Sequence, residues 1–279
     1  MADESSTGSP IATVPRVATA LESVAIGAGL VAVYAVTAVL GSRLVGFGPP
    51  HPDPAAGLIL PFAMLFGVVG VIAGGIGVIV RDVLLGGTGT WTVAVTVTHL
   101  FAGYVCLRLG RAQLTGLRPS TNTVVRLGAI TVLTAVAAGA MVGWTGEVLA
   151  IAPFFLAGIT TAGYLIVLVI VGVPVLVLGH RFVPVRSTEV TGVRPVFLLG
   201  AVLIGWLILG IVGSIGYYNL DRVPGWLLVD AGLGPLLPIL EHPAIGRGAV
   251  NVQTAIAAIA IGATVALTAR MPGGGSPWT

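Results

Sequence analysis

Long apolar stretches recur along the chain and limit it to one class of fold. Of the 279 residues, 56% are hydrophobic and only 8% are charged. This leaves too little charge to cover the surface of a water-soluble domain of this length. Several stretches approach or exceed the roughly 20 apolar residues that cross a bilayer as a helix. The sequence therefore predicts an all-α, polytopic transmembrane helix bundle in the cell membrane, with the lipid bilayer as its surroundings.

The charged residues and the single cysteine argue against several functional classes. All thirteen basic residues are arginines, and they stand singly at segment ends, so no nucleic-acid partner is expected. Cys106 is the only cysteine, which excludes a disulfide framework or a cysteine-based zinc site within the chain. The sequence contains no HExxH, GxSxG or paired intramembrane aspartates. We therefore expect neither an enzyme nor a metal or other cofactor.

The apolar runs predict seven or eight membrane segments. They are expected at 22–44, 58–85, 92–109, 123–145, 149–179, 195–218 and 249–270. The run 58–85 is either one long tilted helix or two pieces broken near Gly67. We favour two pieces, of which the first is too short to span a membrane alone and is expected to be buried or re-entrant.

The arginines predict the orientation of these segments. Eight of them share one face of the predicted bundle, which is assigned as cytoplasmic because positive charge is retained inside. They are Arg108, Arg111, Arg118, Arg126, Arg181, Arg186, Arg194 and Arg270. Two pieces in the run 58–85 place the N-terminus inside, and one piece places it outside.

The polar and proline-rich stretches divide the chain into four parts. These are a polar N-terminal tail (1–20), a six-helix bundle (21–182), two additional transmembrane helices with a long outer loop (183–270), and a flexible C-terminal tail (271–279). Within them, 46–57 is expected to be a proline-rich outer loop and 224–246 an outer loop with too many prolines and glycines for a spanning helix.

A stripe of glycines runs along the segment 58–85. Gly67, Gly70, Gly74 and Gly77 fall within an arc of about 80° on one helix face, which lets a neighbouring backbone approach closely. Arg81 continues this stripe, and Asp82 lies at its edge. Two interpretations are open: Arg81 extends to water at the headgroup boundary, or both charges belong to a polar pocket at the outer mouth of the bundle. On the second interpretation, Arg81→Ala weakens ligand retention and leaves folding largely intact.

The next segment carries a polar face. Thr92, Thr96, His99, Gly103 and Cys106 share that face, and His99 lies about 12 Å below the outer end of the helix at 1.5 Å per residue. A histidine at this depth faces the bundle interior. It either makes a satisfied interhelical hydrogen bond or lines a polar cavity.

The outer ends of these segments gather the candidate ligand-binding residues. The candidates are Arg81, Asp82, Trp91, Thr96, His99, Trp144 and Glu147. The proline-rich loop with His51 and Asp53 comes to the same level. Charges of both signs, aromatic rings and a loop over a polar helix face are features of a small-molecule site. The alternative is that the two tryptophans are only interfacial-belt residues.

Four stretches of the chain resemble the substrate-binding S components of energy-coupling-factor (ECF) transporters. They are "GLVAVYAVTAVL", "GLILPFAMLFG", "VVGVIAGGIGVIVRDVLLGG" and "LFAGYVCLRLG". The resemblance covers about residues 22–182 and implies that the loop after the first helix closes over a ligand near the outer face. It also implies that small residues of the first helix pack against a membrane coupling subunit, here Ala25, Ala28, Gly29 and Ala32. The two helices after residue 190 depart from the family pattern.

The leading functional hypothesis is therefore a solute-binding membrane subunit that captures a vitamin, a vitamin precursor or an ion. The chain has no GxxxxGK[ST] phosphate-binding loop, so ATP-driven transport would rely on separate ATPase chains. A membrane-embedded sensor or scaffold domain is the first alternative. A stand-alone secondary transporter is the second, and it would ordinarily need a charge or a broken helix near the midplane.

Overall fold

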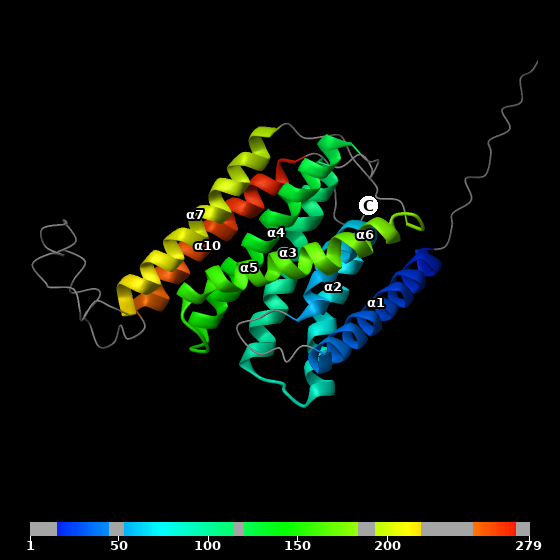
Figure 1. Ribbon diagram of the computed structural model, residues 1–279, viewed down its shortest axis with the longest axis horizontal. Coiled ribbons are helices and arrows are strands. Elements are labelled where there is room, and N and C mark those ends of the chain that lie inside the picture. The colour runs from blue at the N-terminus through cyan, green and yellow to red at the C-terminus, as the bar shows by residue number, and fades with distance from the viewer. Residues whose placement is uncertain (1–15, 45–52, 114–119, 184–192, 219–247, 272–279) are drawn as a thin grey trace, which may run out of the picture.

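The computed structural model describes residues 16–44, 53–113, 120–183, 193–218 and 248–271, and these residues form a helical bundle (Figure 1). Its α-helices are α1 (Arg16–Leu44), α2 (Ile59–Leu85), α3 (Thr90–Gln113), α4 (Thr121–Val148), α5 (Ala157–Val167), α6 (Val173–Gly179), α7 (Val193–Tyr218) and α10 (Gly248–Ala269). Three short elements accompany them: the 3₁₀-helices η1 (Pro54–Leu58) and η2 (Phe154–Leu156), and the π-helix η3 (Leu168–Gly172).

Six helical stretches of the described residues are long and apolar enough to cross a membrane. They are Ala20–Arg43, Pro54–Leu85, Thr90–Arg111, Thr121–Val148, Phe154–Gly179 and Arg194–Ile215. The apolar part of α10, Gln253–Ala269, is shorter. The all-α fold is thus confirmed, and these six helices are consistent with a multi-pass membrane protein. Helix α1 begins earlier than predicted, at Arg16, because Val17 to Leu21 contain no glycine or proline to end the helix.

The helices pack in a row with α4 at its centre. Two-thirds of the most apolar part of α4 is buried, against 28% for α1 and for α7. Helix α4 contacts α3, α5, α7 and α10, and α3 contacts α2, which in turn contacts α1. Figure 1 shows α7 (yellow) beside α10 (orange) at one edge of the bundle and α1 (blue) at the opposite edge. The main hydrophobic core therefore lies around α4.

Helix α2 is broken at Gly67, as the two-piece prediction required. Gly67 has φ 63° and ψ −136°, a backbone conformation that glycine adopts and side chains disfavour. The chain folds back on itself there, because a Cβ atom built on Gly70 would lie 1.9 Å from the carbonyl oxygen of Phe62. Residues 55–64 are buried. The segment 54–85 is therefore a helical hairpin whose first arm lies inside the protein.

Contacts define the two ends of the bundle. A Cβ atom on Gly67 would lie 3.2 Å from a guanidinium nitrogen of Arg111, and the guanidinium of Arg108 donates to the carbonyl of Thr268. The turn of the hairpin, the end of α3 and the end of α10 therefore meet at one end, here called the inner end. The opposite end, which holds Asp53 and Arg81, is called the outer end.

The first arm of the hairpin begins earlier than predicted. The sequence predicts a loop over 46–57, but residues 54–58 form η1. The carboxylate of Asp53 accepts a hydrogen bond from the backbone N–H of Ala56, and Pro54 stands at the start of the helix. Both features favour helix initiation. The rest of that loop, the predicted outer loop 224–246 and most of both predicted tails lie outside the described residues.

The predicted helix 149–179 is also divided. It begins at Phe154, after Pro153, and passes through the π-helical turn η3 before Pro174. A proline has no N–H to donate to the preceding turn, which explains why the regular hydrogen-bond ladder shifts there. Gly172 in this turn faces Gly57 so closely that a Cβ atom on Gly172 would lie 2.5 Å from the Gly57 carbonyl oxygen.

Candidate functional site

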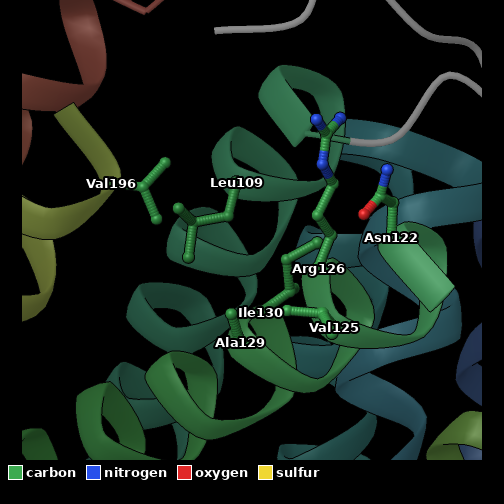
Figure 2. A pocket seen from close by; sticks show the side chains of 7 residues that line it. All are labelled: Leu109, Asn122, Val125, Arg126, Ala129, Ile130 and Val196. Atoms are coloured by element: carbon green, nitrogen blue, oxygen red, sulfur yellow. The ribbon is translucent and has the colours of Figure 1, made fainter. Parts of the chain in front are cut away.

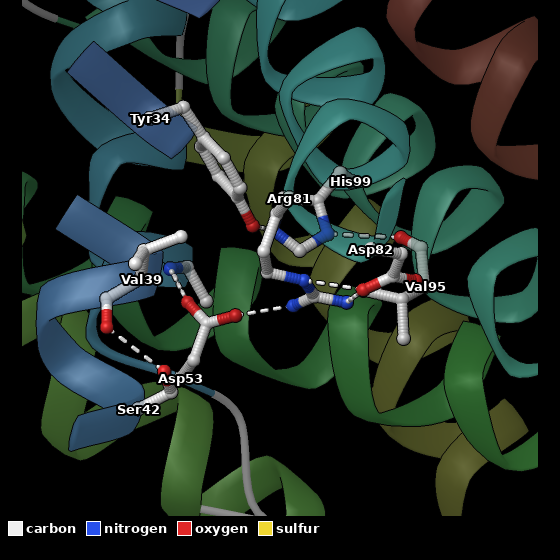
Figure 3. A network of polar contacts seen from close by, with 9 residues as sticks. Tyr34, Val39, Ser42, Asp53, Arg81, Asp82, Val95 and His99 are labelled. Carbon is white, nitrogen blue, oxygen red and sulfur yellow. Dashed lines mark hydrogen bonds and ion pairs between the residues drawn. The ribbon is translucent and has the colours of Figure 1, made fainter. Parts of the chain in front are cut away.

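A buried ion-pair cluster lies at the outer end of the hairpin (Figure 3). The Nε atom of Arg81 donates to Oδ1 of Asp82 at 2.6 Å, and the Nη1 atom of Arg81 pairs with Oδ2 of Asp53. The three side chains are only 9–11% exposed. Asp53 and Arg81 each stand fourteen positions from Gly67, at the open end of the hairpin. Their ion pair therefore joins the two arms.

Asp53 uses both carboxylate oxygens in this arrangement. Oδ1 accepts from the backbone N–H of Ala56 at 3.2 Å, and Oδ2 accepts from Arg81. The same side chain thus starts η1 and neutralises the guanidinium. Arg81 is held inside the protein by this pairing, rather than extended to water at the headgroup boundary.

A second pair of polar side chains accompanies the cluster. The hydroxyl of Tyr34 lies 2.8 Å from Nε2 of His99, and Nδ1 of His99 lies 2.9 Å from the carbonyl oxygen of Val95. A carbonyl oxygen only accepts, so Nδ1 carries a proton. In the neutral imidazole, Nε2 is then the acceptor for the Tyr34 hydroxyl. His99 is 2% exposed and Tyr34 is fully buried, so the interior position predicted for His99 is present in the structure.

Aromatic rings surround His99. The ring of Tyr34 from α1 lies edge-on to the imidazole at a centroid distance of 5.5 Å, and the ring of Tyr164 from α5 lies at 6.3 Å. Both tyrosines are buried. The site is thus assembled from α1, α2, α3 and α5, together with Asp53 before η1.

The predicted glycine stripe of α2 is shortened by the break at Gly67, and Gly77 is the member that reaches this site. Gly70, Gly74 and Gly77 are buried, in keeping with the prediction that the stripe faces protein. A Cβ atom on Gly77 would lie 2.6 Å from the ring of Tyr34, so glycine is required for the ring to fit. A Cβ atom on Gly74 would meet no atom within 4 Å. The stripe therefore supports Tyr34 at one position and leaves room for a methyl group at the next.

The charges of the cluster do not cancel. Two carboxylates face one guanidinium, so Asp53, Arg81 and Asp82 together carry one negative charge in excess when His99 is neutral. The tyrosine rings beside His99 add aromatic surface. This combination is suited to a polar solute that brings a positive charge or hydrogen-bond donors.

The structure does not bring all seven predicted site residues together. Arg81, Asp82 and His99 come together as described. Trp144 and Glu147 lie instead at the end of α4, where Nε1 of Trp144 donates to the Thr254 hydroxyl at 3.4 Å. Oε2 of Glu147 accepts from the backbone N–H of Phe154 at 2.9 Å.

The other two predicted residues are on α3. Trp91 is partly buried and packs against both hydrophobic cores. The hydroxyl oxygen of Thr96 is buried, and no hydrogen-bond partner for it occurs among the described residues. The prediction left out Tyr34 and Tyr164, and it named Asp53 only as part of a loop. A tyrosine within the apolar run "VAVYAV" was a usable signal, because a buried phenol hydroxyl requires a hydrogen-bond partner.

The small residues of α1 lie on its exposed face. Ala25, Ala28, Gly29 and Ala32 are all exposed, and a Cβ atom on Gly29 would meet nothing within 4 Å. Within the described chain, this face is covered by no other helix.

A separate pocket opens toward the inner end, between α3, α4 and α7 (Figure 2). It has a volume of about 320 Å³. Its lining residues are Leu109, Asn122, Val125, Arg126, Ala129, Ile130 and Val196. Only two of these side chains are polar, so the pocket is mainly apolar. It lies toward the opposite end of α3 from His99.

The described residues contain no group of three or more histidine, cysteine, aspartate or glutamate side chains that could hold a metal ion. Cys106 is buried in α3, with its sulfur 4.0 Å from the Leu60 carbonyl oxygen. Comparisons of the chain with protein-family models, with curated proteins and with solved structures found no match.

Proposed function

We propose that this chain is an integral membrane solute-binding protein that captures a small molecule at the outer end of its helix bundle. The observation that carries the proposal is the buried cluster of Asp53, Arg81 and Asp82 beside the Tyr34–His99 pair. Ionisable groups inside a membrane bundle are costly, and they mark substrate or ion pathways. The cluster supplies charge, hydrogen-bonding groups and aromatic surface at one place.

Asp53 is the residue of this site that a solute would displace from Arg81. It comes from the segment that follows α1, whereas Arg81 and Asp82 are fixed on one helix. A solute that enters the cluster would compete with Asp53 for Arg81 or bind the excess negative charge beside it. This agrees with the ECF S components that the sequence resembles, in which the loop after the first helix closes over the ligand. The solute class we favour carries a positive charge or several donors.

The hairpin supports the eight-segment arrangement. Its turn meets the inner end of α3 beside Arg111, and its first arm is buried, in keeping with the expectation that the shorter piece is buried or re-entrant. With Arg108 and Arg111 inside, the N-terminus is also inside and Asp53 is outside. The solute would then enter from the outer side of the membrane.

Energy for uptake would come from partner chains. The exposed small-residue face of α1 is suited to close packing against a membrane coupling subunit, because small side chains let two helix backbones approach. Separate ATPase subunits would act through that subunit. Helices α7 and α10 pack against α4, away from α1, and leave this face open.

A stand-alone secondary transporter is the second candidate. The observation that favours it is the π-helical turn Leu168–Gly172 within an apolar segment, because transporters use irregular backbone of this kind at their binding sites. A sensor or scaffold protein is the remaining alternative.

The deciding experiment is purification of the tagged chain from its own host in mild detergent, followed by mass spectrometry of the retained proteins and metabolites. We expect an ATPase pair, a coupling membrane subunit and one small polar metabolite. Recovery of a kinase or another signalling protein without an ATPase would favour the sensor. Recovery of the metabolite without partner proteins would favour the secondary transporter.

A variant tests the assignment of the site. Asp53→Asn keeps an oxygen for the Ala56 N–H and removes one negative charge, so we expect the retained metabolite to fall at least about tenfold, which corresponds to about 1.4 kcal/mol of binding. Glu22→Gln makes the same chemical change at an exposed position of α1 and should retain the metabolite fully. Equal retention by both variants would place the solute elsewhere.

A further inference from the structure

The pocket at the inner end of the bundle combines a charged end with an apolar interior. Figure 2 shows the guanidinium of Arg126 and the amide of Asn122 toward one end of it, and the apolar side chains of Leu109, Ala129 and Val196 toward the other. Leu109 is fully buried, so the pocket reaches into the bundle between α3, α4 and α7. An occupant would need a polar part for Arg126 and an apolar part for the space beside it.

The mouth of the pocket lies on an apolar surface. Val125 and Ala129, which line the pocket, are exposed on α4. Their exposed neighbours Val124 on α4 and Phe197 on α7 are apolar too. In a membrane bundle, exposed apolar side chains contact the acyl chains of the bilayer. An occupant would therefore enter from the lipid rather than from water.

The polar end of the pocket carries positive charge. Helix α4 begins at Thr121, so Arg126 stands about 7.5 Å from the start of the helix at 1.5 Å per residue, a depth from which its side chain reaches the headgroups. Asn122 is one turn closer to that start and adds an amide donor. Arg194 is exposed on α7, two positions before Val196. None of the described residues that line the pocket is acidic.

The direction of α4 adds to this preference. The pocket lies along the first turns of the helix, where the helix dipole favours an anion. Side-chain charge and helix dipole therefore select the same sign, and the apolar mouth selects a ligand that carries hydrocarbon.

We infer that this pocket binds an anionic phospholipid, with its phosphate at Arg126 and Asn122 and part of one acyl chain along Ala129 and Val196. A guanidinium matches a phosphate in charge and geometry. Basic pockets between transmembrane helices on the cytoplasmic side, to which the arginines assign this end, bind anionic headgroups. The volume of about 320 Å³ is at the lower limit for ligand pockets, so the rest of the lipid would lie along the exposed face of α4.

The lipid site is independent of the proposed solute site. It is built on α3, α4 and α7 toward the opposite end of α3 from His99, and it shares no residue with the Arg81 cluster. Loss of lipid binding and loss of the solute can therefore be measured separately.

The test titrates the purified chain in mild detergent with phosphatidylglycerol or with phosphatidylcholine of the same acyl chains, while its thermal unfolding midpoint is followed. A ligand that binds only the folded chain raises this midpoint. We expect a saturable rise in phosphatidylglycerol alone, and native mass spectrometry should find one such lipid retained per chain. Glycerol 3-phosphate supplies a phosphate without acyl chains and should have no effect. Equal rises with both phospholipids, or a rise with glycerol 3-phosphate, would overturn the inference.

A charge variant tests the polar end of the pocket. Arg126→Gln should raise the half-saturating concentration of phosphatidylglycerol about tenfold, because it removes a charge-assisted hydrogen bond to the phosphate. Arg181→Gln is the matched control, since Arg181 is exposed just after α6, where Gly179 packs on Leu65 near the hairpin turn. It should bind as the unmodified chain does. Equal losses in both variants would mean that the midpoint reports overall charge and would contradict a site at Arg126.

A second variant tests the apolar end without a change of charge. Ala129 is exposed, so Ala129→Leu should leave the midpoint in phosphatidylcholine little changed. The larger side chain occupies the pocket, however, and should weaken the response to phosphatidylglycerol. Val124→Leu enlarges an exposed side chain of the same helix outside the pocket lining and should keep the full response. A full response in Ala129→Leu would show that the lipid does not occupy the pocket.

Discussion

The ring of Tyr34 lies directly against the backbone of Gly77, at a distance that leaves no room for a side chain. This contact fixes the phenol hydroxyl within 2.8 Å of His99, so a glycine on α2 determines how α1 and α3 are joined. The candidate site therefore depends on packing as much as on charge.

Replacement of Gly77 by alanine should displace Tyr34. The added methyl group would lie 2.6 Å from the ring, so we expect a loss of about 1–3 kcal/mol in the free energy of unfolding from overpacking. The measurement is the thermal unfolding midpoint in detergent. Gly74→Ala is the matched control, because a methyl group there meets no atom within 4 Å. Equal effects at both positions would contradict the contact.

Removal of Arg81 should destabilise the protein. Arg81→Gln leaves the carboxylates of Asp53 and Asp82 buried without a cation, which typically costs about 3–5 kcal/mol. This prediction differs from the expectation from sequence that Arg81→Ala leaves folding largely intact. Arg43→Gln, at the exposed end of α1, should change stability by less than about 0.5 kcal/mol.

The Asp53–Arg81 pair can be isolated by a double-mutant cycle. Asp53→Asn in the Arg81→Gln background removes one of the two uncompensated charges, so the double variant should be more stable than the sum of the single changes predicts. We expect a coupling energy of about 0.5–3 kcal/mol between these contacting groups. Additive effects would mean that the two residues do not interact in the membrane-embedded protein.

Loss of the Tyr34 hydroxyl should destabilise the protein, because His99 loses a hydrogen-bond donor. Tyr34→Phe keeps the ring against Gly77 but leaves Nε2 of His99 buried without a donor, which costs about 1–3 kcal/mol. The unfolding midpoint reports this loss. Tyr104→Phe removes another tyrosine hydroxyl, which forms a part-buried hydrogen bond with the Thr268 hydroxyl near the inner end. If Tyr34→Phe costs nothing while Tyr104→Phe is destabilising, the Tyr34–His99 hydrogen bond does not contribute to stability.

A side chain at Gly67 should disrupt the hairpin. With φ at 63° and ψ at −136°, Gly67→Ala places a Cβ atom in a conformation that costs about 1–3 kcal/mol. Unfolding midpoints for this variant and for Gly128→Ala are the measurement. Gly128 is exposed on α4 with open space around it, so its replacement should be neutral or slightly stabilising.

The sequence predicted the hairpin and the helices because local patterns determine them. The break at Gly67 was favoured over one long tilted helix because the run is longer than one crossing needs and contains a glycine where a tight turn can form. His99 was assigned to the interior because a histidine is costly in lipid. Helix ends came within a few residues wherever proline, glycine or polar residues interrupt the apolar runs.

The assembly of the site required information about which helices are neighbours. One sequence shows that Glu147 and Arg81 lie near the same end of their helices, but not that Glu147 faces α7 while Arg81 faces Asp53. Tyr34 meets His99 across 65 positions of chain, and no periodicity within either helix reports that pairing. The cap at Asp53 was missed because prolines on both sides of it suggested a loop.

The symmetry of Asp53 and Arg81 about Gly67 also bears on how the chain is inserted into the membrane. The 32-residue, largely apolar run Pro54–Leu85 satisfies the length requirement of a single tilted crossing, whose two ends would emerge on opposite sides. Asp53 and Arg81 would then be separated by the thickness of the bilayer. Their ion pair forms only when the run enters the membrane, turns at Gly67 and returns to the same side. The pair therefore stabilises the hairpin over a chain in which the run crosses the membrane once.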